Sequence, residues 1–598
     1  MLLSILTVVV FGAPLAAAPL DARAGPDSPS RNYAPARVQC PSPRPTIRDA
    51  DSLSTQEAMW LARRKQVVVR PMVGYLSRAG IPDFDASAFV EQIRSNASVL
   101  PTVAIALSGG GYRALLHGAG FLAAADTRTP NMTAGGGIGG LLQSSTYIAG
   151  LSGGAWLVGS LYMNNFSSVV SLRDGSPTSV TDYWGRALSY QLVNDTGGGP
   201  AYTFSSVTYG EAFIRAQIPF PILVANSRTP SSAASPLNST VFEFNPYETG
   251  SWDPATYGFA PTRFLGSDFS GGVVPPAGSC VQGLDNAGFV VGTSSSLFNA
   301  FLLRNLTSAG NVPPAVAGAV ASLLGADAVD EDVARWAPNP FFGFRPATNP
   351  AATARELHLV DGGEDLQNLP LYPLLQPQRA VDVIFAVDAS ADTDAGWPNA
   401  TALRATYERS RGPLARGARF PAVPDAHTFV NLGLNRRPTF FGCRATASGW
   451  GPPDAPGPSP PVFPGPLVVY VPNAPYTAQT NASTFEASYA RARRDDAIRN
   501  GLDAATQGNG SLDAAWPVCV ACAVLSRSLA RTATPAPIAC RDCFARYCWD
   551  GALDPRDRGP YLPDFIIRNG TTVESPAGRA AAAVAWWAGT GLAAWCLL

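Results

Sequence analysis

The pentapeptide Gly150–Gly154 constrains the fold more than any other stretch of this 598-residue chain. It reads Gly-Leu-Ser-Gly-Gly, with Ser152 at its centre. A β-prone run at 145–149 precedes it, and the apolar residues 155–162 suit a buried helix. A serine on a sharp, glycine-flanked turn between a strand and a helix is the nucleophile-elbow arrangement. The stretch therefore predicts an α/β fold with Ser152 as a nucleophile, although a plain Gly/Ser loop is the alternative.

A second glycine-rich turn reads Ser-Gly-Gly-Gly-Tyr-Arg-Ala at 108–114 and follows a β-type run, Val103–Leu107. Apolar residues at helical spacing come next, so this is another strand, loop and helix. No Gly-Lys-Ser/Thr follows, which excludes a phosphate loop. Three successive glycines, Gly109–Gly111, let backbone N–H groups reach a tetrahedral intermediate, which predicts an oxyanion hole, although a flexible turn is the alternative. The helix start behind Ser152, at Gly153, also offers free N–H groups to an oxyanion. Arg113 suits a phosphate or carboxylate.

A third β-type run, Glu356–Val360, leads into the loop Asp361–Asp365. Asp361 stands where a strand would deliver it, although an ordinary turn aspartate is the alternative. Parallel strands place their carboxyl ends along one edge of a sheet, so we expect the three loops to converge. Val381–Val387 is predicted as a buried strand. Residues 167–269 show few clear periods and are interpreted as insertions packed on the core.

A Ser-His-Asp triad needs a histidine after the acid in chain order. The chain has three histidines, His117, His358 and His427. His117 lies on the helix after the glycine loop, and His358 lies three residues before Asp361 on the opposite strand face. Only His427 follows Asp361, so it is the one candidate base for a triad.

The cysteine count predicts a disulfide framework. Nine cysteines are present, and eight remain if Cys596 leaves with a C-terminal signal: Cys40, Cys280, Cys443, Cys519, Cys522, Cys540, Cys543 and Cys548. The two Cys-x-x-Cys pairs have the spacing of a zinc ribbon. A secretory route favours disulfides instead. The net charge of −1 argues against a nucleic-acid partner, and 46% hydrophobic content allows a large core.

The two ends of the chain resemble processing signals. Residues 1–18 fit a secretory signal peptide, and 19–39 are predicted to be a flexible lead-in. Residues 556–579 are predicted to be a linker before the uncharged tail 580–598. Small residues, a spacer and a hydrophobic tail resemble a signal for a glycosylphosphatidylinositol (GPI) anchor, with attachment near 569–571 or 575–578. A transmembrane helix is the rival interpretation.

Asn-x-Ser/Thr sequons fit a glycosylated secreted chain and predict surface loops. Ten are present, at Asn96, Asn131, Asn165, Asn194, Asn238, Asn305, Asn399, Asn481, Asn509 and Asn569.

The motifs at 108–114, 150–154 and 361–365 together resemble those of the fungal lysophospholipases (phospholipase B), which are related to cytosolic phospholipase A. Further strings extend the resemblance over about residues 40–555, namely 244–248, 292–299, 430–435 and 540–549. One departure is Leu366, where a small or polar residue is expected. The departure should not affect the chemistry.

The resemblance implies a mixed, largely parallel sheet flanked by helices, with insertions that form a cap. It implies a Ser-Asp dyad of Ser152 and Asp361, with an oxyanion hole at Gly110 and Gly111 and phosphate contact by Arg113. The implied substrates are phospholipids and lysophospholipids at a membrane or micelle surface, with no cofactor or metal. The alternatives are a triad esterase that uses His427 and a non-catalytic wall glycoprotein. The chain would be secreted or GPI-anchored at the cell surface.

Overall fold

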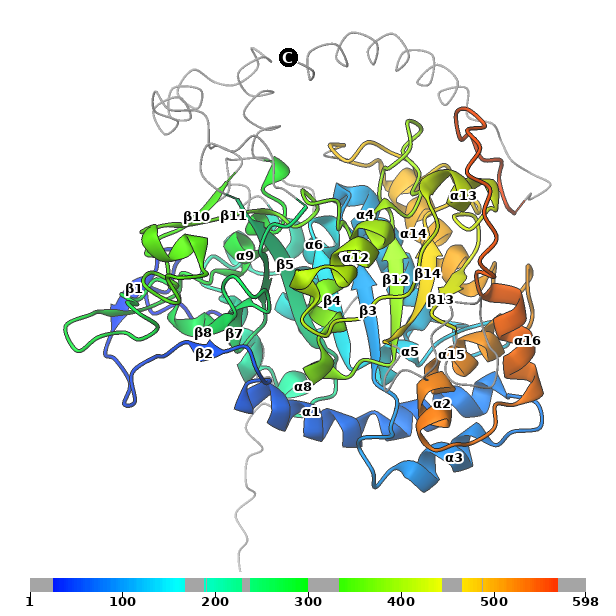
Figure 1. Ribbon diagram of the computed structural model, residues 1–598, viewed down its shortest axis with the longest axis horizontal. Helices are drawn as coiled ribbons and strands as arrows, with labels where there is room; N and C mark the ends of the chain where they lie inside the picture. Colours follow the sequence, from blue (N-terminus) through cyan, green and yellow to red (C-terminus); the bar gives the residue numbers. More distant parts are fainter. Residues whose placement is uncertain are drawn as a thin grey trace, which may run out of the picture.

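The computed structural model describes residues 25–166, 188–189, 191–228, 237–298, 333–443, 465–486 and 488–567. In these residues, twelve strands form one mixed sheet with helices packed around it (Figure 1). Five neighbouring strands at its centre are parallel to one another. The predicted α/β class with a mixed, largely parallel sheet is confirmed. None of the helices in the described part is long and apolar enough to cross a membrane.

The strand order places the glycine-loop strands at the centre of the sheet. In spatial order the strands are β13 (Thr439–Phe441), β14 (Leu467–Pro472), β12 (Val383–Asp388), β3 (Val103–Leu107), β4 (Tyr147–Leu151), β5 (Phe220–Ser227), β6 (Val241–Phe244), β7 (Glu248–Ser251), β8 (Gly258–Pro261) and β2 (Arg48–Asp49). Strand β11 (Leu357–Asp361) pairs with β5 and with β10 (Ala334–Trp336). A separate two-stranded sheet joins β1 (Ala36–Val38) to β9 (Cys280–Gln282).

Strands β3, β4, β12 and β14 are buried along their whole length. Their near-continuous apolar sequences fit this position, because parallel strands are covered on both faces. In the view of Figure 1, α12 lies in front of the sheet and α1 and α2 run below it. The α-helices are α1 (Thr55–Val67), α2 (Val69–Ala79), α3 (Ala86–Ile93), α4 (Gly111–Ala125), α5 (Leu141–Ser144), α6 (Gly153–Met163), α8 (Glu211–Ile214), α9 (Ala287–Thr293), α12 (Thr401–Arg411), α13 (Ala426–Asn431), α14 (Arg491–Thr506), α15 (Trp516–Arg531) and α16 (Ile538–Tyr547).

Strand β5 brings two distant segments together. Its first half pairs in parallel with β4, where Leu151 lies opposite Val224. Its second half pairs antiparallel with β11, where Asp361 lies opposite Ala225. The end of β4 and the end of β11 therefore meet at adjacent residues of β5. The expected convergence occurs, but an antiparallel strand delivers Asp361, so its position does not follow from the parallel edge that the sequence suggested.

Several predicted elements are found close to their expected bounds. The strand at 103–107 is β3, the strand at 381–387 is β12, and the run at 356–360 is β11. Two regions differ from prediction. The stretch interpreted as irregular contains β5 to β8, which extend the central sheet, and the predicted lead-in includes β1. Residues 1–18, 299–332, 444–464 and 568–598 lie outside the described residues, and so do the calls made on them.

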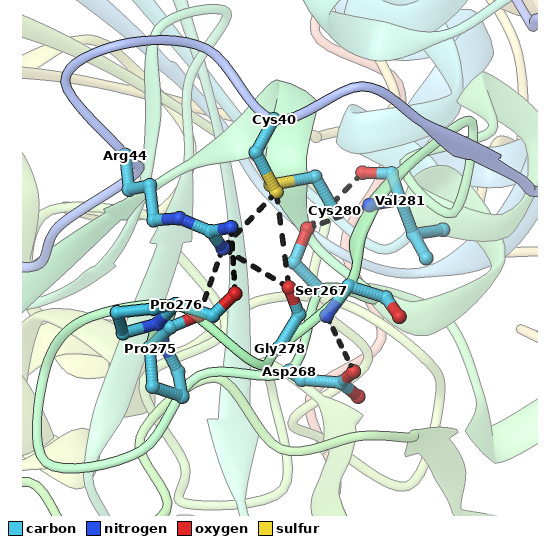
Figure 2. The surroundings of a disulfide bond; sticks show 10 residues. Cys40, Arg44, Ser267, Asp268, Pro275, Pro276, Gly278, Cys280 and Val281 are labelled. Carbon is cyan, nitrogen blue, oxygen red and sulfur yellow. Dashed lines mark hydrogen bonds between the residues drawn. A yellow bond between two sulfur atoms is a disulfide. The ribbon is translucent and has the colours of Figure 1, made fainter.

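All eight predicted cysteines are joined in disulfides: Cys40–Cys280, Cys443–Cys548, Cys519–Cys543 and Cys522–Cys540. The cysteines with ribbon spacing cross-link α15 to α16. The Cys40–Cys280 bond fixes the N-terminal segment beside the β1–β9 pair (Figure 2). There the Arg44 guanidinium donates to the carbonyl oxygens of Pro275 and Gly278 at 2.8 and 3.0 Å. The disulfides therefore connect both ends of the described chain to the core.

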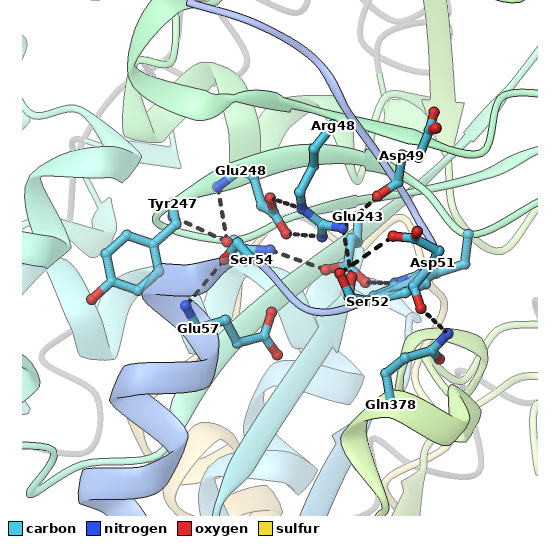
Figure 3. A network of polar contacts seen from close by, with 12 residues as sticks. Arg48, Asp49, Asp51, Ser52, Ser54, Glu57, Glu243, Tyr247, Glu248 and Gln378 are labelled. Atoms are coloured by element: carbon cyan, nitrogen blue, oxygen red, sulfur yellow. Dashed lines mark hydrogen bonds and ion pairs between the residues drawn. The ribbon is translucent and has the colours of Figure 1, made fainter.

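A cluster of buried charges lies where α1 meets the sheet. The Arg379 guanidinium donates to Glu57 Oε1 at 2.9 Å and to Glu243 Oε2 at 2.7 Å, and all three side chains are buried. Figure 3 shows Glu57 and Glu243 from two different elements, with the Arg48–Glu248 ion pair nearby. We refer to Glu57, Arg379 and Glu243 as the Arg379 cluster.

Candidate active site

Ser152 occupies the turn between β4 and α6 with φ 50° and ψ −118°. A non-glycine residue holds such a conformation only where its surroundings enforce it. The backbone at the neighbouring glycines packs so closely against other backbone atoms that only residues without a side chain fit there, and this packing holds the turn in place. A Cβ on Gly154 would lie 2.2 Å from the Leu107 carbonyl oxygen, and one on Gly150 would lie 2.5 Å from the Gly154 oxygen. The predicted elbow is therefore present, with Ser152 only 3% exposed.

Asp361 ends β11 beside Ser152 and is 4% exposed. Burial raises the pKa of its carboxyl group to about 6. Two neutral groups oppose this shift: the Gly363 N–H, which donates to Asp361 Oδ1 at 2.9 Å, and the nearby Ser152 side chain. The nearby charge of Asp365 adds to the rise in the pKa. The structure therefore brings the predicted nucleophile close enough to the predicted base for the Ser152 side chain to lower the pKa of the Asp361 carboxyl group.

Two helix N-termini meet beside Ser152. Gly110 has φ 128° and immediately precedes α4, and Gly111 has φ 61° at its first position. A Cβ on Gly153, the first residue of α6, would lie 2.1 Å from the Gly111 carbonyl oxygen. The first N–H groups of an α-helix have no acceptor within the helix, and the helix dipole makes that end positive. The three predicted glycines therefore lie together at a place suited to negative charge.

The buried Arg113 side chain connects three segments near the glycine loop. Its Nε donates to the Ala389 carbonyl oxygen at 2.7 Å, and its Nη2 donates to Thr484 Oγ1 at 3.0 Å. Its Nη1 donates to the carbonyl oxygen of Ala482. Burial lowers the pKa of this guanidinium. These contacts use three of the five N–H groups, so the arginine has a holding role in addition to the predicted phosphate contact.

The three histidines do not join this pair. His117 is buried in α4, and burial lowers its pKa to about 4. His358 Nε2 lies 3.2 Å from Glu356 Oε2, and His427 is exposed on α13. Within the described part of the chain, no hydrogen bond links any of the three to Ser152 or Asp361. The geometry does not support the triad alternative.

Sequence reasoning missed a residue that holds the glycine loop. The backbone carbonyl oxygen of Asn368 accepts from the Gly109 N–H at 2.9 Å. The side-chain Nδ2 of Asn368 donates to the Gly109 carbonyl oxygen at 3.2 Å. The same Nδ2 donates to Ser390 Oγ at 2.8 Å. Asn368 lies three residues after the loop Asp361–Asp365 in the sequence. That closeness to the motif was the one feature of the sequence that could have indicated a role for it at the site.

The described sequons divide by exposure. Five asparagines are exposed and fit the predicted surface loops: Asn96, Asn131, Asn194, Asn238 and Asn509. Three are partly buried: Asn165, Asn399 and Asn481. Asn305 and Asn569 lie outside the described residues. Glycosylation itself stays a prediction.

A cavity of about 680 Å³ lies beside α12. Asp365 and Leu366 line it, but neither Ser152 nor Asp361 does. Leu366 is 49% exposed with φ 67°, so the departure from the family motif lies at the surface. This cavity therefore borders the candidate active site without containing it.

The fold is similar to that of a solved enzyme. The structure of human GIVD cytosolic phospholipase A2 superposes with a TM-score of 0.56 at 18% identity, covering 83% of this chain and 72% of that one. The chain thus has the α/β fold of a cytosolic phospholipase A2, with a serine elbow at the carboxyl end of a central strand.

A family model described as the lysophospholipase catalytic domain matches residues 103–177 and 173–554. Lysophospholipase 1 of Aspergillus fumigatus is 49% identical over 592 residues, which cover 91% of each chain. Lysophospholipase 3 of the same organism is 47% identical over 96% of each chain. A lysophospholipase of Arthroderma benhamiae is 46% identical over 93% of this chain and 91% of its own. The chain belongs to the fungal lysophospholipase family, whose members are carboxylic ester hydrolases.

Proposed function

We propose that this protein hydrolyses acyl esters of lysophospholipids and phospholipids through an acyl-serine intermediate. Ser152 is the nucleophile and Asp361 is its general base. The observation that carries the proposal is the meeting of the strained Ser152 turn and the buried Asp361 carboxyl at adjacent residues of β5, where the Ser152 side chain lowers the pKa of Asp361. A general base must lie within hydrogen-bond reach of the proton that it takes.

The reaction proceeds in two displacements. Ser152 Oγ attacks the acyl carbonyl carbon while its proton moves to Asp361. The tetrahedral intermediate collapses, the glycerol oxygen leaves, and Asp361 returns the proton to it. Water then attacks the acyl-serine with Asp361 again as base, and the fatty acid leaves as Ser152 regains its proton. The pKa of about 6 makes Asp361 a stronger base than an ordinary aspartate.

The N–H groups of Gly110, Gly111 and Gly153 stabilise the oxyanion in both steps. This role is supported by the position of the three glycines at two helix N-termini that meet beside Ser152. Fixed hydrogen-bond donors in a buried site stabilise developing negative charge strongly. Arg113 contributes its remaining N–H groups to the substrate phosphate. The bidentate geometry of a guanidinium suits phosphate oxygens.

We also propose that the enzyme is secreted or anchored at the cell surface and acts on substrates in micelles or membranes. Secretion is supported by the four disulfides, which persist in oxidising compartments. Attachment by a GPI anchor is part of the proposal and rests on the C-terminal sequence alone.

A fluorophosphonate probe tests the chemical core of this proposal. The wild-type protein is expected to take up one probe per chain, on the peptide that carries Ser152. Labelling should abolish fatty-acid release from lysophosphatidylcholine micelles and from diacylphosphatidylcholine vesicles. The Ser152→Ala variant should show neither labelling nor release. Labelling on another residue, or turnover by folded Ser152→Ala, would overturn the proposal.

A further inference from the structure

The segment after α9 contacts both members of the proposed dyad. Ser294 Oγ accepts from the Ser152 N–H at 3.0 Å, and Ser296 Oγ accepts from the Asp361 N–H at 3.1 Å. Both serines are fully buried. Two hydroxyls spaced two residues apart thus bind the backbones of two residues that are 209 positions apart in the sequence.

The hydroxyl of Ser294 is itself oriented. It donates to the Val224 carbonyl oxygen at 2.6 Å, so its lone pairs face the Ser152 N–H. Val224 lies opposite Leu151, and the next residue of β5 lies opposite Asp361. The segment 294–296 therefore lies at the junction where β4 and β11 meet on β5.

The segment is anchored by α9. Asn286 caps this helix by accepting from the N–H groups of Gly288 and Phe289 at 3.0 and 3.3 Å. The side of α9 that carries Val291 packs closely on α6 at Gly159. A Cβ atom at Gly159 would lie only 2.5 Å from a Val291 methyl carbon, so no larger residue fits there without a shift. The helix that follows Ser152 and the helix that delivers Ser294 are thereby held in fixed positions.

We propose that Ser294 and Ser296 are positioning residues that set the alignment of the Ser152 hydroxyl with the Asp361 carboxylate. Ser152 holds a strained backbone, and its N–H is fixed by the hydrogen bond to Ser294 Oγ. Asp361 is the last residue of the short strand β11, and its N–H is fixed by the hydrogen bond to Ser296 Oγ. Functional side chains need such support to stay within productive geometry. This inference rests on the proposed function.

Ser295 supplies a matched control in the same segment. It is equally buried, and its hydroxyl donates to the carbonyl oxygens of Val291 and Gly292 in the preceding helix α9 at 3.0 and 3.4 Å. Replacement by alanine removes the same atoms in all three cases. Only the changes at Ser294 and Ser296 remove a hydrogen-bond acceptor of the backbone N–H groups of Ser152 and Asp361.

The experiment compares Ser294→Ala, Ser296→Ala and Ser295→Ala in the full-length protein. Lysophosphatidylcholine turnover gives kcat and KM, a fluorophosphonate gives the labelling rate constant of Ser152, and thermal melting reports folding. We expect kcat and the labelling rate to fall about 10- to 100-fold at Ser294 and Ser296, because small misplacements of reacting groups have effects of this size. KM should stay within about twofold, and Ser295→Ala should match wild type in kcat within about twofold.

Equal kcat and labelling rates in all three folded variants would overturn the inference, whatever their melting temperatures. A rise in KM without a fall in kcat would also overturn it. If Ser294→Ala fails to fold, Ser296→Ala carries the same test through the other dyad residue. Turnover by Ser152→Ala would instead refute the proposed function. An inactive Ser152→Ala with unaffected Ser294→Ala and Ser296→Ala would refute the positioning role alone.

Discussion

The Arg379 cluster and the candidate active site both bury carboxylates, but they treat the charge in opposite ways. In the cluster, one guanidinium binds Glu57 and Glu243. At the active site, Asp361 accepts a hydrogen bond from the Gly363 N–H and lies near the Ser152 side chain, and both of these groups are neutral. The three carboxylates are similarly buried, so the two sites differ in the charge of the groups that bind the carboxylates.

The pKa values of Glu243 and Asp361 shift in opposite directions. Burial by itself would raise the pKa of Glu243, but the charge and hydrogen bonds of Arg379 outweigh it and lower the pKa below its ordinary value. At Asp361 the effect of burial prevails and the pKa rises to about 6. Glu243, held by Arg379, therefore has little tendency to take a proton, whereas Asp361 with its neutral partners accepts one more readily. The comparison separates a carboxylate that supports the fold from one that is able to act as a base.

The largest effect on stability is expected from Arg379→Met. The change leaves two buried carboxylates without a cation, and breaking a buried ion pair in this way costs about 3–5 kcal/mol. Denaturant unfolding measures the loss. Arg404→Met is the control, because Arg404 pairs with Glu408 on the exposed side of α12 and should lose less than about 1 kcal/mol. Equal losses in the two variants would remove the distinction between buried and exposed pairs.

Asp361→Asn should change stability in the opposite direction. The pKa of Asp361 is raised in the folded state, so keeping the carboxylate ionised destabilises the fold above about pH 6. Asparagine removes that cost, and we expect a gain of up to about 3 kcal/mol at pH 7–8. The gain should shrink as the pH falls from about 6 towards 4, where wild-type Asp361 keeps its proton in the fold. Unfolding curves at pH 4.5 and 7.5 test this, and a loss of stability at both pH values would contradict the comparison.

The activity of the wild-type enzyme should report the same group. Because Asp361 must be ionised to act as base, kcat/KM should fall below about pH 6, by about tenfold per pH unit. Asp365→Asn removes a charge that raises the pKa of Asp361, so the midpoint should move to lower pH. A midpoint that stays in place in Asp365→Asn, or an acidic limb that is absent in wild type, would count against Asp361 as the base.

A smaller effect is expected from Arg113→Lys, which tests the phosphate contact. Lysine retains the charge but not the planar fork, so hydrolysis of lysophosphatidylcholine should fall about tenfold more than hydrolysis of a neutral p-nitrophenyl ester. Parallel kinetics on the two substrates measure the difference. An equal loss on both, with a lower melting temperature, would assign Arg113 only the holding role that its bonds to Ala389 and Ala482 describe.

The sequence predicted the local elements of the site but not how they assemble. The glycines around Ser152 need positive φ or close approach, so the elbow was readable from a few adjacent residues. The meeting of β4 and β11 on β5 depends on non-local pairing, and β5 itself gave no periodic signal. Ser294, Ser296 and Asn368 act through hydroxyl and amide contacts across the fold. Ser294 and Ser296 belong to the string 292–299 that resembles the family, but nothing in that string or around Asn368 indicates which backbone groups these side chains contact.

The central claim is that Asp361 acts as base without a histidine, and turnover of folded Asp361→Asn tests it most directly. Its lysophosphatidylcholine hydrolysis should fall by at least about 1,000-fold, since loss of a catalytic base has effects of this order. His427→Ala, which changes an exposed side chain on α13, should keep its rate within about twofold. Retention of more than a few per cent of the wild-type rate by Asp361→Asn, or a comparable loss in His427→Ala, would contradict the account.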